Sequence, residues 1–175
     1  VIIGSNLMSS EMLAGDYSAA QALQWVNNNG DSYCLEGAFT FCKTKFKVAE
    51  ALIGWVYDSR NRFLFADQGM TQRLMASVAI PGSEVEYWTL RYNLTRYQPL
   101  FGNWVGLWNT QLGYGQALGH TTALPPFKQF HSGGPKSTRG FKESWLGPKD
   151  SRGRPYGGNV LIASQLELLF PLPDK

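Results

Sequence analysis

Residues 86–98 read Glu-Tyr-Trp-Thr-Leu-Arg-Tyr-Asn-Leu-Thr-Arg-Tyr-Gln, and two kinds of side chain alternate along this stretch. The even positions from Trp88 to Leu94 are aromatic or aliphatic, whereas the odd positions from Thr89 to Thr95 are polar or charged. Because neighbouring side chains of a strand point to opposite faces, this pattern predicts a β-strand with one apolar and one polar face.

The same period of two recurs along the chain. It predicts further strands at 47–58, 69–80, 104–115 and 158–169, and the end of another at 1–8. In the first of these the polar face carries Glu50, and in the last it carries Glu167. We therefore expect an all-β chain of about six consecutive antiparallel strands.

Composition leaves two classes of β-protein open. Charged residues make up 17% of the chain and aromatic residues 14%, and no apolar run approaches the roughly 20 residues of a membrane helix. A transmembrane β-barrel fits these values. So does a soluble carbohydrate-binding β-domain with an aromatic binding surface formed by Trp55, Trp88, Trp104 and Trp108. The net charge of +3 is too small to indicate a nucleic-acid partner.

The connections between the expected strands differ in length. Those near 58–69, 81–84 and 99–103 are short, whereas about 9–46 and 119–157 are long. Mostly short turns at one end and long loops at the other are typical of an outer-membrane barrel, whose long loops face outside the cell. In the first long loop, alanines favour a helix at 16–27, which Asp16 or Ser18 is expected to cap.

The second long loop contains Phe127, Phe130, Phe141, Trp145 and Tyr156. Disordered segments are poor in aromatic residues, so we expect this loop to be folded. Two glycine pairs, at 133–134 and 157–158, mark places where the backbone turns or approaches other atoms closely. Arg139 stands between them, and its guanidinium requires an acceptor inside a folded loop.

Cys34 and Cys42 are the only cysteines of the chain. They form a disulfide if the compartment is oxidising, and otherwise they are buried free thiols. No cluster of histidines or cysteines predicts a metal site, and nothing in the sequence implies a cofactor. The chain also has no Gly-x-Ser-x-Gly motif, and His120 and His131 have no nucleophile at a characteristic spacing. We expect no enzymatic activity.

Several segments, taken in order, resemble one protein family. They are Gly54–Asn61, Ile80–Ser83, Gly113–Gly115, Pro125–Phe127, Phe130–Gly134, Ser137–Phe141, Leu146–Pro148, Gly157–Asn159 and Leu166–Pro173. Together they are similar to the C-terminal barrel of the BamA family, central subunits of the machinery that assembles β-barrels in the bacterial outer membrane. The resemblance covers nearly all of 47–175 and, more loosely, 1–46.

The resemblance implies a specific role for the second long loop. Arg139, Gly140 and Phe141 match a family motif on a loop that folds back into the barrel lumen, where the arginine meets acids on the wall. Glu167 is the matching acid here, and a second is expected on a following strand. The residues expected to support the loop are Gly133, Gly134, Gly147, Pro148, Gly157, Gly158 and Asn159.

The resemblance also implies a fold, a location and partners. Residues 1–175 are expected to be part of a 16-stranded barrel that is integral to the bacterial outer membrane, with periplasmic modules that are not among these residues. Expected partners are unfolded outer-membrane β-barrel clients, the lipid bilayer, and assembly-machinery lipoproteins that bind mainly the periplasmic modules. The implied function is folding and insertion of the clients. A two-partner secretion or a translocation-and-assembly transporter is the alternative.

Overall fold

The computed structural model describes residues 1–35, 40–135, 137–150 and 152–170. In this part of the chain seven strands and one helix follow one another as β1 (Ile2–Gly15), α1 (Ala20–Asn28), β2 (Asp31–Leu35), β3 (Phe41–Asp58), β4 (Gly69–Ala79), β5 (Tyr87–Pro99), β6 (Val105–Ala117) and β7 (Val160–Leu169). Pro171–Pro173, which take part in the family resemblance, lie outside the described residues. No helix of the described residues is long and apolar enough to cross a membrane.

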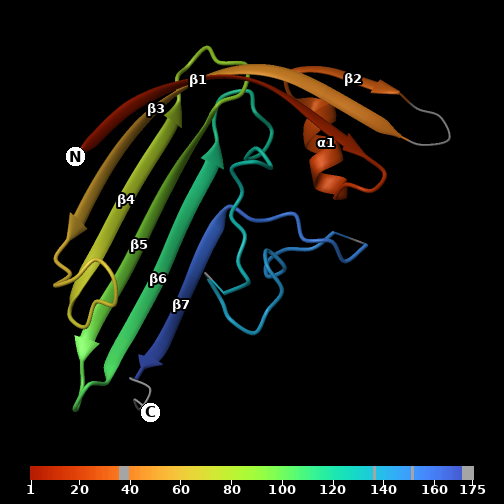
Figure 1. Cartoon of the computed structure of the whole chain (residues 1–175). Coiled ribbons are helices and arrows are strands. Elements are labelled where there is room, and N and C mark those ends of the chain that lie inside the picture. The colour runs from red at the N-terminus through yellow and green to blue at the C-terminus, as the bar shows by residue number, and fades with distance from the viewer. Residues whose placement is uncertain (36–39, 136, 151, 171–175) are drawn as a thin grey trace.

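All seven strands belong to one antiparallel sheet. Its order is β1-β3-β4-β5-β6-β7, and β2 pairs with the first residues of β3. This end of the sheet lies at the top in Figure 1, and we call it the upper end. Figure 1 shows the long strands side by side, and the segment between β6 and β7 beside the sheet rather than as a continuation of it. The predicted all-β antiparallel architecture is therefore confirmed.

The two faces of the sheet differ as the alternation predicts. One face presents exposed apolar side chains, which we call the apolar face: Ile53, Trp55, Tyr57, Leu74, Val78, Leu90, Trp108, Leu112, Tyr114, Ile162, Leu166 and Leu168. The opposite face, here the polar face, carries Glu50, Ser77, Thr89 and Glu167. A broad exposed apolar face on a twisted sheet is typical of the wall of a membrane barrel.

The predicted bounds of the first long loop, about 9–46, were wrong: this loop is the connection between β1 and β3, residues 16–40, and it contains α1 and β2. β1 continues to Gly15, and β3 begins at Phe41. The alternation of apolar and polar residues continues on the N-terminal side of Lys47, but there the apolar residues stand on the opposite face of the strand. From Cys42 to Val48 the buried residues lie on the polar-face side, and the lysines between them point the other way. The apolar set moves because this end of β3 is covered on its inner side by α1 and by a loop.

The helix is shorter than predicted, and neither proposed capping residue caps it. α1 follows Ala19, whose side chain makes no capping hydrogen bond. Ser18 Oγ instead accepts a hydrogen bond from Gly15 N–H, and Asp16 Oδ2 accepts one from Thr40 N–H. Both side chains are therefore used in the turn that precedes the helix. The apolar side of α1 packs as expected, since Trp25 and Val26 are buried.

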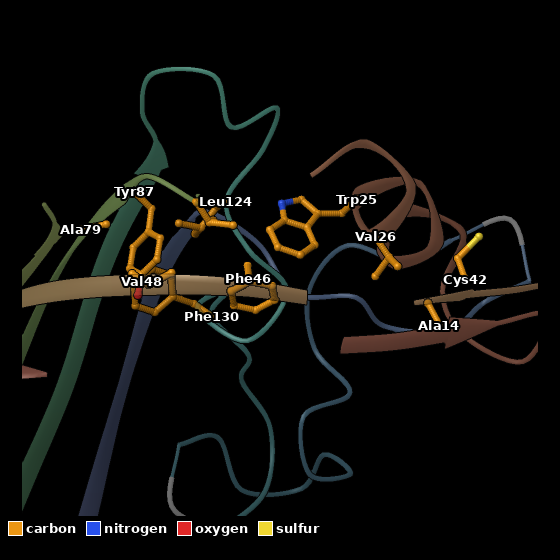
Figure 2. Packing of buried hydrophobic residues seen from close by; sticks show 11 residues of the cluster. Ala14, Trp25, Val26, Cys42, Phe46, Val48, Ala79, Tyr87, Leu124 and Phe130 are labelled. Carbon is orange, nitrogen blue, oxygen red and sulfur yellow. The ribbon is translucent and has the colours of Figure 1, made fainter. Parts of the chain in front are cut away.

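The main hydrophobic cluster lies where α1, the upper ends of the strands and the second long loop meet. Its members include Ala14, Trp25, Val26, Cys42, Phe46, Val48, Tyr87, Leu124 and Phe130. In Figure 2 the Trp25 indole extends from the helix towards Leu124 and Phe46. The Trp25 and Phe46 rings meet edge to face at a centroid distance of 5.9 Å. The core thus joins both long loops to the sheet.

Cys34 and Cys42 form a disulfide across the β2–β3 hairpin, where they stand opposite each other in register. The bond closes a short segment of sequence separation 8. Cys42 is also part of the hydrophobic cluster. The bridge therefore holds β2, and with it the connection from α1, against β3.

Replacing both Cys34 and Cys42 by serine should open this hairpin. Closing so short a segment contributes about 2–3 kcal/mol, so trypsin should cleave after Lys43 and Lys45 much faster in the variant. Cleavage after Arg62, in the turn at the other end of β3, provides the control and should not change. Equal cleavage rates at the two lysines would show that the disulfide does not constrain the hairpin.

Candidate functional site

The second long loop, residues 118–159, covers the polar face of the sheet at its upper end. Backbone hydrogen bonds join both ends of the loop to strands: Leu118 N–H donates to Glu86 O, and Gly115 N–H donates to Asn159 O. Near its start the loop also contacts α1, because Trp25 Nε1–H donates to Ala123 O at 2.9 Å. The loop is thus attached to the sheet and to the helix of the other long loop.

Asn29 extends this link between the two loops. Its Nδ2 donates to Thr122 Oγ1 at 2.8 Å, and its Oδ1 accepts Thr122 N–H at 3.1 Å. The backbone carbonyl of Asn29 accepts the Thr44 hydroxyl, which lies on β3. One buried asparagine therefore bridges α1, the second loop and the sheet.

A largely buried ionic contact joins Lys128 of the loop to Glu50 on β3. Lys128 Nζ lies 2.7 Å from Glu50 Oε1, and the two side chains are 21% and 5% exposed. The Tyr87 hydroxyl donates to the same carboxylate oxygen at 3.3 Å, and the ammonium lies 5.1 Å from the Tyr87 ring centroid. A buried carboxylate without partners is costly, so Lys128 and Tyr87 together make the position of Glu50 tolerable.

Sequence reasoning missed Lys128 and this pairing. Glu50 is visible in the sequence as an acid on the polar face of its strand, the same face that carries Glu167. This similarity to Glu167 was the only feature of the sequence that pointed to a loop partner for Glu50. The choice of partner depends on how the loop folds, which spacing does not reveal.

Below this contact, an aromatic ring fills space left by a glycine. A Cβ atom added at Gly113 on β6 would lie 2.5 Å from the Phe130 ring. The guanidinium of Arg91, on the neighbouring strand, lies 4.7 Å from the centre of the same ring. Phe130 is itself only 6% exposed. The absence of a side chain at Gly113 thus lets the Phe130 ring pack against the polar face of β6, and the Arg91 guanidinium covers the ring.

The structure also brings Arg139 and Glu167 together. Arg139 Nη2 lies 3.1 Å from Glu167 Oε2, with the two side chains 65% and 15% exposed. An ion pair whose cation is this exposed contributes little, about 0–1 kcal/mol. Arg139 follows a turn in which Thr138 N–H donates to Gly134 O, and Gly140 has a φ of +85°. Phe141 is 53% exposed, so its ring is not part of the core.

The predicted supporting residues differ in what they do. Gly133 and Gly157 have positive φ and no room for a side chain, since a Cβ would meet Lys142 O at 2.3 Å and the His131 ring at 2.7 Å respectively. Gly158 pairs its backbone with Phe130 in both directions. The remaining predicted residues shape the turns: Gly134 and Gly147 have positive φ, Pro148 O accepts Tyr156 N–H, and Asn159 O accepts Gly115 N–H.

A further contact that sequence reasoning missed closes the last turn of the loop. The buried Asp150 carboxylate accepts the backbone N–H groups of Arg154 and Arg152 and forms an ion pair with the Arg154 side chain. These donors, the Arg154 backbone first, hold the pKa of Asp150 below its ordinary value. Arg154 Nη1 also donates to Asp16 O. This turn therefore ties the second loop to the first.

The side chains of the site attach the second long loop to the sheet. Among the described residues, no group of three His, Cys, Asp or Glu side chains could hold a metal ion. The charged groups that meet beneath the loop satisfy one another, as Lys128 does with Glu50 and Arg139 with Glu167. The arrangement fixes a loop to the inner side of a sheet.

Comparisons with known proteins give this arrangement a context. The profile of the family described as the Omp85 superfamily domain matches residues 11–175. The outer membrane protein assembly factor BamA of Neisseria meningitidis serogroup B is 33% identical over 177 residues, which is 98% of this chain and 22% of that protein. A SAM50-like protein of Drosophila melanogaster is 29% identical over 118 residues, covering 67% of this chain and 26% of that protein.

A solved structure has the same fold. It is the crystal structure of BamA from Haemophilus ducreyi lacking POTRA domains 1–3, which matches with a TM-score of 0.78 and 22% sequence identity over 98% of this chain and 35% of that one. The chain therefore spans about a fifth to a third of the length of these proteins.

The Lys128–Glu50 contact should stabilise the folded protein more than the Arg139–Glu167 contact. Lys128→Met leaves a buried carboxylate without its counterion and should lower the unfolding free energy by about 3–5 kcal/mol, whereas Lys128→Met combined with Glu50→Gln should cost much less. Urea titration of the protein in lipid vesicles measures both values. Arg139→Ala serves as the comparison, with an expected loss below about 1 kcal/mol. A greater loss for Arg139→Ala than for Lys128→Met would reverse this ranking.

A side chain in the space between Gly113 and the Phe130 ring should loosen the loop. Gly113→Val forces the ring away, at a cost of about 1–3 kcal/mol, and trypsin should then cleave after Lys142 more readily. Gly106→Val is the matched control, because it lies on the opposite face of the same strand and its Cβ meets nothing closer than 3.6 Å. If the two variants are cleaved alike, Phe130 does not anchor the loop.

Proposed function

The chain belongs to the Omp85 superfamily, and from this membership we propose that it forms part of the wall and the internal loop of a barrel that folds and inserts other β-barrel proteins into the bacterial outer membrane. The relative from Neisseria meningitidis is named an outer membrane protein assembly factor. The apolar face then lies against lipid, and the loop of residues 118–159 lies inside the barrel.

The observation that carries this proposal is a wall with its own loop fixed to the polar face. Lys128 and Phe130 attach the loop near the upper end of the sheet, and Arg139 attaches it lower down, at Glu167. Assembly of other barrels requires no covalent chemistry. It requires a wall that stays folded while strands open elsewhere, and a braced loop supplies this.

Strand pairing provides the mechanism. A closed barrel has no free strand edge, whereas an opened seam exposes unpaired N–H and C=O groups that can pair with the strand of a client. In the family the seam joins the first and last strands of the barrel. The strands β1 and β3 to β7 are then part of the wall, and the motif of Arg139, Gly140 and Phe141 braces the lumen against Glu167.

The proposed partners follow from this arrangement. Unfolded outer-membrane β-barrel clients are the substrates, and the bilayer contacts the apolar face. Assembly-machinery lipoproteins are expected to bind mainly the periplasmic modules. The long loops, with α1 and the Cys34–Cys42 disulfide, face outside the cell. The alternative of a soluble carbohydrate-binding domain is not retained, because Trp55 and Trp108 belong to the broad apolar face.

Replacing Arg139 by alanine tests the proposed role of the loop. The variant should reduce the amounts of client β-barrels in the outer membrane, while its own folded barrel keeps its heat-modifiable gel mobility, because the exposed ion pair contributes little stability. Arg62→Ala, in a turn at the other end of the sheet, removes the same charge and should have no effect on client levels. Normal client levels in the Arg139→Ala strain would contradict the proposal.

A further inference from the structure

One arginine lies on the apolar face of the sheet. Arg96 stands in register with Met70 on β4 and Trp108 on β6, and Trp108 in turn stands opposite Leu166 on β7. The row lies near the end of the sheet that carries the short turn at 100–104. A cation among these side chains is expensive at the centre of a bilayer but is tolerated near its edge.

The guanidinium of Arg96 is hydrogen-bonded to the side-chain amide of Gln98 and forms no ion pair with a carboxylate among the described residues. Its Nη2 donates to Gln98 Oε1 at 3.2 Å. In the part of the chain that the structure describes, Arg96 takes part in none of the ion pairs, although Arg60, Arg139 and Arg154 each have a carboxylate partner. Arg96 is exposed. Its charge thus remains available to an anion that reaches this face.

A groove of about 560 Å³ begins at Arg96 and runs across β6. Its lining is mostly apolar, with Leu100, Trp108, Leu166 and Leu168 around Gly106; Leu107 and Glu167, which stand on the opposite, polar face of the sheet, complete it. Gly106 leaves the floor of the groove without a side chain, and the nearest atoms that a Cβ there would meet are those of the Leu100 side chain and the Gln98 carbonyl oxygen, at 3.6–3.8 Å. The groove therefore combines a cationic end with an apolar channel on the face that meets the bilayer.

We propose that this groove is a phospholipid site, in which Arg96 and Gln98 bind the headgroup phosphate and an acyl chain lies over Gly106 against Trp108 and Leu166. A guanidinium offers a planar fork of donors that matches phosphate oxygens. Tryptophan is favoured at the boundary between headgroups and hydrocarbon. A soluble anion would satisfy the arginine but leave the apolar channel empty, and a protein partner would require its own apolar strand to lie in lipid.

The site rests on the proposed membrane location of the apolar face but not on the assembly of clients. Its test therefore uses binding of lipid to the purified full-length protein, which remains measurable whether or not that protein assembles other barrels. Native mass spectrometry in detergent micelles counts bound phosphatidylglycerol as the lipid is titrated. Heat-modifiable gel mobility first establishes that each variant is folded.

Two variants separate the two halves of the site. Arg96→Gln removes the charge and should weaken binding of the most tightly held phosphatidylglycerol about fivefold, the effect expected of one cation at a membrane surface. Gly106→Leu fills the channel, leaves Arg96 intact, and should also weaken binding. Arg73→Gln is the control, because it removes an equal charge from the polar face of β4 and should leave binding unchanged.

Ligand controls identify what the groove recognises. Diacylglycerol, which has chains but no phosphate, and glycerol 3-phosphate, which has phosphate but no chains, should both bind more weakly than phosphatidylglycerol. Equal binding of diacylglycerol would overturn recognition of the phosphate, and equal binding of glycerol 3-phosphate would overturn the role of the channel. Unchanged lipid binding in both Arg96→Gln and Gly106→Leu would overturn the site itself.

Discussion

The rest of the structure depends on one buried carboxylate, that of Glu50 on the polar face of the sheet, whose charge must be compensated by a partner. It is 4% exposed on β3, and Lys128 of the second long loop reaches it at 2.7 Å. Once this contact forms, Phe127 and Phe130 are carried to the same face of the sheet. Phe127 stacks on Phe46, and Phe130 fills the space over Gly113. The position of the loop thus follows from one charge and the packing around it.

The docked loop explains the change of sides along β3. Where the sheet is proposed to face lipid, the apolar side chains of Ile53, Trp55 and Tyr57 point outwards. Further up, from Cys42 to Val48, the apolar residues point inwards because α1 and the second loop cover them. One strand therefore carries two patterns in sequence, each matched to its surroundings. In the proposed function, this covered end is the part of the wall that holds the loop while client strands pair elsewhere.

Sequence reasoning recovered the features that depend on local alternation. Trp88 to Leu94 placed a strand and its apolar face correctly, and Glu167 was assigned to the polar face. It failed where the surroundings of one strand change along its length, so that Lys43 and Lys45 of β3 were assigned to a loop. It also missed Lys128, Asn29 and Asp150, because their partners are distant in sequence and depend on the fold of the loop. The meeting of Arg139 with Glu167 came from family resemblance, since spacing alone gives an arginine no partner.

The second long loop must be fixed to the wall in the membrane-embedded protein, and amide hydrogen exchange in lipid vesicles tests this directly. Phe130 N–H donates to Gly158 O and Gly158 N–H donates to Phe130 O, beneath a ring that rests on β6. An isolated pair of bridges of this kind is not stable in water, so these amides are protected only if the loop is docked. We predict exchange as slow as that of β5 and β6. Exchange of Phe130 and Gly158 at the rate of a free peptide would contradict the account.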